Sequence, residues 1–314
     1  MSWTPLAAQS YRVAMTVDDL PFVGTGSPST TQAEEAKRAA KANHKLLRAL
    51  ARHHVPVTGF VVQRGVEDLG VASGTTILRE WTASGFDLGN HTNEHRDFNE
   101  MSVEQFEDQV IRGEGAFAEL MKAAGRKVEF FRFPFNHTGD TQEKHDSAAA
   151  FLAGRGYRLA PCTIETSDWM FARSYELMLV RGDHTGATKL RKEYLAFTAE
   201  QIDYFNGLNK QVWGYDLPQI MLIHDNQLNA DVIEDLLAIF ERKKFKWITL
   251  SEAESDPAYS LPDTLVAKGG PMWGYRWARE RNVKVDGRLE HEPPKWVEDY
   301  GKDTDWTRRT RSVF

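Results

Sequence analysis

Short runs of apolar residues alternate with longer amphipathic stretches along most of this chain. Seven of the apolar runs have the length of a β-strand: Tyr11–Val17, Val55–Val62, Phe86–Asn90, Val128–Phe133, Tyr157–Cys162, Gln219–His224 and Lys246–Leu250. Between them, charges spaced as on a helix surface predict helices over Thr31–His53, Thr75–Ala83, Val103–Ala124, Asp140–Ala153 and Ala230–Lys243. This alternation predicts an α/β fold with a parallel sheet, and about seven strands without a GxGxxG turn favour a barrel.

Two regions break the alternation. Residues 170–216 predict two helices, roughly Phe171–Val180 and Ala187–Val212, inserted before the strand Gln219–His224. Such an insertion at the βα face of a barrel would form a wall of the cleft. Residues 256–314 form a tail with four tryptophans and few periodic apolar positions, which we expect to wrap the barrel exterior. We therefore predict a barrel over residues 1–255 and a C-terminal extension over residues 256–314.

Composition narrows the classes of function. The net charge of −6 argues against nucleic acid as the main partner, and no apolar run approaches the length of a membrane span. The lone cysteine, Cys162, permits no internal disulfide, and its place in a strand predicts a core position. The first residues lack the basic and apolar regions of a signal peptide, so we expect either a cytoplasmic protein or one whose signal peptide has been removed.

Carboxylates and imidazoles follow two of the predicted strands. Asp18 and Asp19 come directly after the first strand, and His91 and His95 follow the third. On a helical turn, histidines four residues apart face the same side and can share a metal ion. One carboxylate would complete an N₂O ligand set with open positions, and the other would accept a proton from water. A turn and a surface histidine pair remain the alternatives.

Arg132 also stands at a strand end, just before Pro134. It could orient a carboxylate base, and the backbone N–H of Phe135 could stabilise an oxyanion. Asp168 could pair with Arg132, while the next residue, Trp169, lines the cleft. A structural ion pair and a helix N-cap are the alternatives for Arg132 and Asp168.

His224 ends a strongly apolar strand, where it could protonate a leaving amine or alcohol, with Leu222 offering apolar surface to an acyl methyl group. A histidine with a purely structural role is the alternative. Because the carboxyl ends of barrel strands meet on one face, Asp18, His91, Arg132 and His224 are expected to share one site.

Five motifs together resemble the polysaccharide deacetylase family, also called carbohydrate esterase family 4 or the NodB-homology family, which includes chitooligosaccharide deacetylases. They are Thr16-Val17-Asp18-Asp19, His91-x3-His95, Arg132-x-Pro134-Phe135, Asp168-Trp169 and Leu222-x-His224. The chain departs from the usual family pattern at Leu20-Pro21, at Phe135 in place of Tyr and at Asn136 in place of Gly.

The resemblance implies a distorted (β/α)7 barrel that binds one divalent metal ion. Two imidazoles and a carboxylate form a borderline ligand set that suits zinc first, with cobalt, manganese or nickel as alternatives. By motif position, Asp19, His91 and His95 would bind the metal, Asp18 would be the base, and His224 the acid. Arg132 and Asp168 would form an orienting pair.

The implied reaction is hydrolysis of acetyl groups on N-acetylated sugars or polysaccharides. Alternatives are an O-acetyl esterase on xylan-type glycans, an amidase on small non-carbohydrate amides and a non-catalytic glycan-binding relative. The expected partner is an acetylated glycan, in the periplasm or outside a bacterial cell.

Overall fold

The computed structural model describes residues 11–24 and 30–302. Within them, seven parallel strands form one sheet. The strands are β1 (Arg12–Val23), β2 (Val57–Val61), β3 (Asp87–Asn90), β4 (Phe130–Phe131), β5 (Arg158–Leu159), β6 (Gln219–Asn226) and β7 (Lys246–Trp247).

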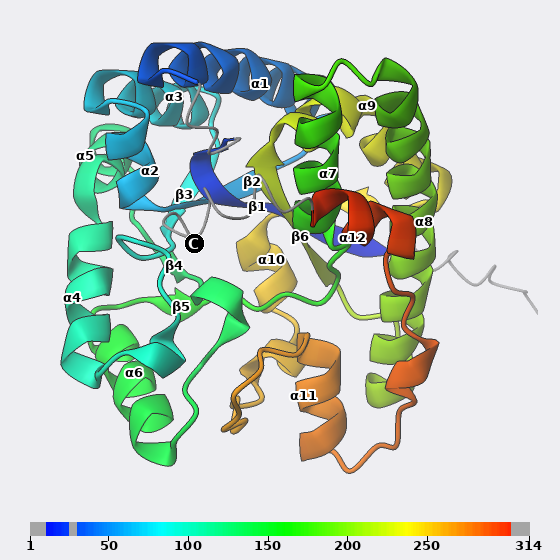
Figure 1. The fold of residues 1–314 in the computed structure, drawn as a ribbon. Helices are drawn as coiled ribbons and strands as arrows, with labels where there is room; N and C mark the ends of the chain where they lie inside the picture. Colours follow the sequence, from blue (N-terminus) through cyan, green and yellow to red (C-terminus); the bar gives the residue numbers. More distant parts are fainter. Residues whose placement is uncertain (1–10, 25–29, 303–314) are drawn as a thin grey trace, which may run out of the picture.

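The strand order is β5-β4-β3-β2-β1-β6, with β7 paired to the first residues of β1. The two ends of this order meet through the segment after β5, because Ile164 forms a parallel bridge with Met221 and accepts a hydrogen bond from the Leu222 N–H at 3.0 Å. The sheet is therefore a distorted α/β barrel, as predicted, and the helices form a ring around its strands (Figure 1).

The α-helices are α1 (Gln32–Arg52), α2 (Gln63–Asp68), α3 (Val71–Ala83), α4 (Val103–Gly113), α5 (Gly115–Ala123), α6 (Gln142–Gly154), α7 (Asp168–Val180), α8 (His184–Trp213), α9 (Gln227–Arg242), α10 (Leu250–Glu254), α11 (Trp273–Glu280) and α12 (Lys295–Gly301). Short 3₁₀ helices cover Phe98–Glu100, Pro134–Asn136, Pro257–Ser260 and Gly287–Leu289. None of the helices in the described ranges is long and apolar enough to cross a lipid bilayer.

Side-chain alternation along β1 separates two environments. Val13, Met15 and Val17 belong to the large apolar cluster that the outer helices share. Ala14 belongs instead to a small cluster whose members come from β1, β2, β4, the residue after β5, β6 and α10, which places it inside the barrel. Because strand side chains alternate, Thr16 and Asp18 share the inward face with Ala14.

The observed elements differ from the predicted ones mainly at their ends. The predicted helix Val103–Ala124 is two helices, α4 and α5, which meet at Glu114. The strands β4, β5 and β7 are only two residues long, and β1 continues to Val23 instead of ending before the carboxylates. The helices α2, α10, α11 and α12 were not predicted, because each is only five to eight residues long and too short to show a helical period clearly.

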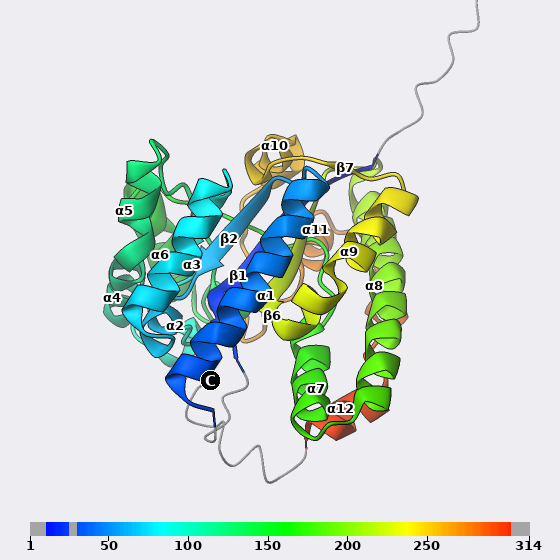
Figure 2. The ribbon, with the colours of Figure 1, turned by 90° about the horizontal axis from the view of Figure 1, so that it is seen from above.

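The insertion forms the helix pair α7 and α8, which lie side by side in Figure 2. In the tail, α12 packs on α7 and α11 packs on α8. Trp273 and Trp277 of α11 are buried, whereas Trp306 lies outside the described residues. The division of the chain at residue 255 stays a prediction.

Candidate metal and catalytic site

The neighbouring strands β1 and β6 bring two predicted site residues into register. Asp18 lies opposite His224, and the regular pairing of β1 with β6 is interrupted directly after this point. In a regular strand the next residue, Asp19, would point to the opposite face. Its φ of 62° lies in the left-handed region. Both carboxylates therefore line the same cleft, together with His224.

Asp19, His91 and His95 form a group suited to a metal ion. Each offers one ligand atom, and these atoms lie within 4.8 Å of one another. Asp19 Oδ1 is 3.5 Å from His91 Nε2 and 3.4 Å from His95 Nε2. Tetrahedral ligands about 2.0–2.1 Å from zinc are roughly 3.3 Å apart, so both separations fit a shared ion.

The hydrogen bonding of these residues supports the same fit. Asp19 Oδ1 is buried and accepts no hydrogen bond from the described residues, so a cation would satisfy it. His91 Nδ1 lies 2.8 Å from the backbone carbonyl oxygen of Arg132, which requires the proton on Nδ1 and turns the Nε2 lone pair toward Asp19. Burial, followed by the neighbouring His95, lowers the pKa of His91 to about 3, so this imidazole is neutral, as a metal ligand must be.

The expected helical turn around the two histidines is absent from the described structure. Residues 91–97 form an irregular loop after β3, in which Thr92 and His95 have φ values of 71° and 53°. The backbone N–H of His95 donates to Thr92 Oγ1 at 3.1 Å. The two imidazoles lie close together because of this loop conformation. The prediction that they lie close together was confirmed, but the helical turn predicted to bring them together was wrong.

Asp18 and Arg132 form a buried ion pair behind the metal group. Arg132 is 1% exposed, and its Nη1 donates to Asp18 Oδ1 and to Thr16 Oγ1, both at 2.7 Å. Its other nitrogens donate to the carbonyl oxygens of Ala160 and Pro161, and its guanidinium lies 4.3 Å from the ring centre of Phe60. This geometry fixes one oxygen of Asp18 and leaves Oδ2 toward His91 Nε2, 3.8 Å away.

The predicted pair between Arg132 and Asp168 was wrong, because Asp168 pairs with His224. Asp168 Oδ1 lies 2.7 Å from His224 Nδ1, and Oδ2 accepts from the His224 backbone N–H at 2.7 Å. Asn226 and Asn229 also donate to Oδ2. The two buried acids therefore serve separate partners, one a guanidinium and the other an imidazole.

Asp168 sets the charge of His224. Burial alone would lower the pKa of His224, but the charge of Asp168 and its hydrogen bond outweigh burial, and Asp19 and Asp18 add to the effect, so that the pKa rises to about 10. A cation bound beside Asp19 would oppose part of this rise. His224 Nε2 faces the cleft side of the site, 4.0 Å from Asp19 Oδ2.

A cavity of about 1000 Å³ lies over these groups. Phe135 and Trp169 line it with 48% and 54% of their surfaces exposed, and the buried Leu222 contributes to its lining. The Phe135 ring lies edge-on to His95, with centroids 4.7 Å apart. Of the ten residues predicted for the site, eight line this cavity, and Arg132 and Asp168 support it from behind.

Sequence reasoning missed several lining residues. Glu165, for which burial raises the pKa to about 7, precedes the Asp168 motif, and Glu176 follows it on α7. Gly270, Met272 and Glu292 come from the tail. The prediction that the tail wraps the barrel exterior was therefore wrong for these three residues, which line the cavity. No residue pattern in the tail signals the contact.

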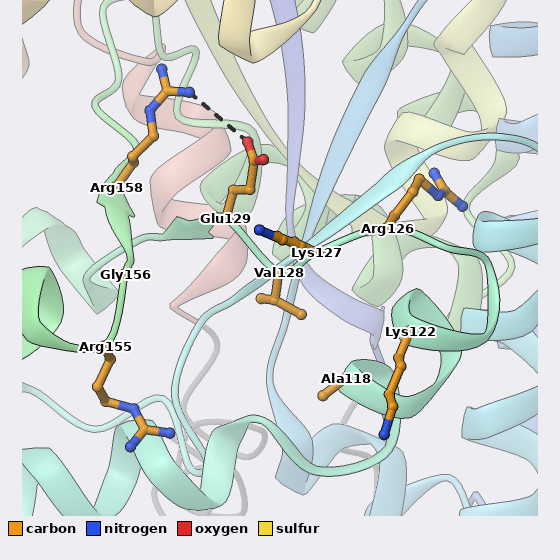
Figure 3. A pocket seen from close by; sticks show the side chains of 9 residues that line it. All are labelled: Ala118, Lys122, Arg126, Lys127, Val128, Glu129, Arg155, Gly156 and Arg158. Atoms are coloured by element: carbon orange, nitrogen blue, oxygen red, sulfur yellow. Dashed lines mark ion pairs between the residues drawn. The ribbon is translucent and has the colours of Figure 1, made fainter.

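A second hollow, of about 670 Å³, lies at the amino-terminal ends of β4 and β5, whereas the metal group lies at the carboxyl ends of the strands. The side chains that line this hollow are drawn in Figure 3. The hollow is rich in basic residues, but these point in different directions (Figure 3). Arg126 donates to Phe86 and Thr82 carbonyl oxygens, Arg155 pairs with Glu114, and Arg158 pairs with Glu254. The three arginines are thus engaged in hydrogen bonds and ion pairs within the fold. The basic side chains drawn here do not converge on one point where a ligand could bind.

Comparisons with known proteins agree with the sequence motifs. Residues 7–152 match the family model described as polysaccharide deacetylase. This range includes the carboxylate pair, both predicted histidine ligands and Arg132, whereas Asp168 and His224 lie beyond it. The match confirms the family resemblance. No curated protein matches the chain.

Solved structures share the fold. A mutant of BA3943, described as a CE4 family pseudoenzyme with restored enzymatic activity, is 15% identical, with 78% of this chain and 67% of that chain covered and a TM-score of 0.52. Wild-type BA3943, a CE4 family pseudoenzyme from Bacillus anthracis, is 14% identical, with 78% and 65% covered and a TM-score of 0.51. The chain spans about two thirds of the length of these structures, and at such identities the likeness concerns the fold alone.

Proposed function

With residues 7–152 matching the polysaccharide deacetylase family, we propose that this protein is a metal-dependent hydrolase that removes acetyl groups from N-acetylated sugars or polysaccharides. The observation that carries the proposal is the convergence of three kinds of group on one cavity. These are a metal-ligand set, a carboxylate with one free oxygen, and a protonated imidazole. Together they supply what amide hydrolysis needs at neutral pH.

Asp19, His91 and His95 would hold the ion. We expect zinc, with cobalt, manganese or nickel as alternatives, because two imidazoles and a carboxylate form a borderline ligand set. When bound, the ion makes a water more acidic and polarises the acetyl carbonyl group.

Asp18 acts as the general base. Arg132 holds Oδ1, so the carboxylate cannot rotate away, and Oδ2 faces the metal group. This oxygen accepts the proton of the attacking water. Arg132 is therefore a positioning residue, which acts through Asp18.

His224 acts as the general acid. Asp168 holds Nδ1 and keeps the imidazole charged, so Nε2 carries a proton to donate to the leaving nitrogen. An amide needs this proton because an amine leaves only once it has been protonated.

Three residues would contact different parts of the acetylated substrate. The Phe135 N–H donates to no acceptor within the described part of the chain, which leaves it free to stabilise the oxyanion. Leu222 offers apolar surface to the acetyl methyl. Trp169, exposed in the cavity, offers an aromatic face for a sugar ring.

The test is acetate release from an N-acetyl oligosaccharide, an O-acetyl xylan and a small cyclic amide, with metal-stripped and metal-restored enzyme. We expect release from the N-acetyl substrate that disappears on stripping and returns with zinc. Preference for the O-acetyl substrate would identify an esterase, and preference for the cyclic amide an amidase.

Activity that survives complete metal removal would refute the metal-dependent assignment. Glycan binding without acetate release from any substrate, unchanged by His91→Ala, would identify a non-catalytic relative. A glycan substrate would place the enzyme in the periplasm or outside the cell.

A further inference from the structure

The tail reaches the Phe135 turn through one buried guanidinium. Arg276 of α11 is 3% exposed, and its Nη2 donates to the carbonyl oxygen of Asn136 at 2.5 Å. Its Nη1 donates to Thr138 Oγ1 at 3.0 Å and to Asp263 Oδ2 at 2.5 Å. Its Nε donates to the carbonyl oxygen of Pro271 at 3.0 Å. A single side chain thus ties residues 136–138 to two points of the tail.

The turn itself has an unfavourable backbone. Phe135 and Asn136 are consecutive residues with φ values of 58° and 55°. Asn enters the left-handed region readily, but Phe rarely does. Such a conformation persists when surrounding contacts hold it in place. The contacts from Arg276 are therefore made where the backbone needs support.

Gly270 supplies a second contact by close approach. A Cβ at this position would lie 2.8 Å from the carbonyl carbon of Asn136 and closer still to the carbonyl oxygen of Phe135. A Cβ on the preceding residue, Gly269, would meet nothing within 4 Å. The tail backbone consequently packs directly against the turn at Gly270, and any side chain there would move the turn.

We propose that the tail residues Asp263, Gly270, Pro271 and Arg276, which we call the clamp, hold the Phe135 turn in the conformation that presents its N–H to the substrate. Arg276 is then a positioning residue. The catalytic consequence rests on the proposed function, in which Phe135 stabilises the oxyanion. The conformational part rests only on the contacts above.

Two pairs of variants test the clamp. Gly270→Ala introduces the clash, and Gly269→Ala makes the same chemical change in open space. Arg276→Gln removes the charge and most donors, whereas Arg276→Lys keeps the charge but cannot reach all four acceptors. For each variant we would measure amide hydrogen exchange over residues 133–138, metal content, kcat and KM.

We expect Gly270→Ala and Arg276→Gln to exchange faster over residues 133–138 and to lose kcat by about 10- to 100-fold, somewhat less than removal of an oxyanion donor. KM should change by less than about threefold, and metal content should not change, because the loss concerns the transition state. Arg276→Lys should lie between Arg276→Gln and wild type, and Gly269→Ala should match wild type.

Wild-type exchange over residues 133–138 in both Gly270→Ala and Arg276→Gln would overturn the clamp. Faster exchange with wild-type kcat would overturn its catalytic role. If Gly270→Ala fails to fold, the comparison of Arg276→Lys with wild type decides both points. Absence of acetate release by the wild type would instead refute the proposed function, and the exchange measurements would still decide whether the clamp holds the turn.

Discussion

Replacing Asp168 by Asn should shift the alkaline limit of activity to lower pH. The substitution keeps the size of the side chain but removes the charge that faces His224 Nδ1 at 2.7 Å. The rise of the His224 pKa from 6.5 to about 10 corresponds to at most roughly 5 kcal/mol in favour of imidazolium, since a cation bound beside Asp19 would oppose part of it. Asp168 is its largest favourable cause, so in the variant we expect the pKa to return to about 6.5 or below.

The size of the effect follows from the fraction of His224 that carries a proton. At pH 8 this fraction falls from nearly all to about 3% if the pKa falls from about 10 to 6.5, a loss of roughly thirtyfold. At pH 6 the two enzymes should differ by about twofold or less. Deprotonation removes the acid, so the sign of the change is loss of activity at high pH.

The assay is the pH profile of kcat/KM on an N-acetyl substrate between pH 5 and 10, with metal content measured at each limit. Asp235→Asn, the same change at an exposed position of α9, is the matched control. A nitrophenyl acetate should show little shift, because its leaving group needs no proton. An equal loss of kcat/KM at every pH, with the alkaline limb of the profile at the same pH as in wild type, would show that the charge of Asp168 does not set the His224 pKa. Asp168 would then be a purely structural residue.

Three further substitutions separate the remaining roles. His95→Ala should lower bound metal from about one equivalent per chain to near zero together with activity; full metal and activity would contradict the ligand set. Arg132→Lys should lower turnover by tens- to thousands-fold, yet leave metal content intact because His91 bonds to the backbone of residue 132; loss of metal with unchanged turnover of remetallated enzyme would contradict its assignment to Asp18. His224→Ala should reduce the rate on an N-acetyl sugar far more than on nitrophenyl acetate, and equal losses would move the acid elsewhere.

The alternation of apolar runs and helices was sufficient to predict the barrel, because burial of each strand between a helix layer and an interior leaves a visible pattern. The same periodicity explains why Asp18 and His224 meet: both occupy inward positions of adjacent strands. The position of Asp19 did not follow from it, because its left-handed backbone breaks the alternation.

Partner choice inside the site could not be predicted. Arg132 and Asp168 both stand near strand ends, and sequence spacing does not tell which acid the guanidinium reaches. The answer depends on the depth of each side chain in the barrel, where Arg132 also meets Thr16 and the carbonyl oxygens after β5. The contact between Arg276 and Asn136, 140 residues apart in the chain, had no local signal at all.

We propose that one cleft holds a metal ion through Asp19, His91 and His95 while Asp18 serves as the base. The most direct measurement compares wild type with Asp18→Asn for bound metal and acetate release from an N-acetyl oligosaccharide. We predict about one equivalent of metal in both proteins, as expected of a single three-ligand site, and acetate release only from wild type, because Asn keeps the shape but cannot accept a proton. Full acetate release by Asp18→Asn would contradict the role of Asp18 as the base, and release by wild type that binds no metal would contradict the metal site.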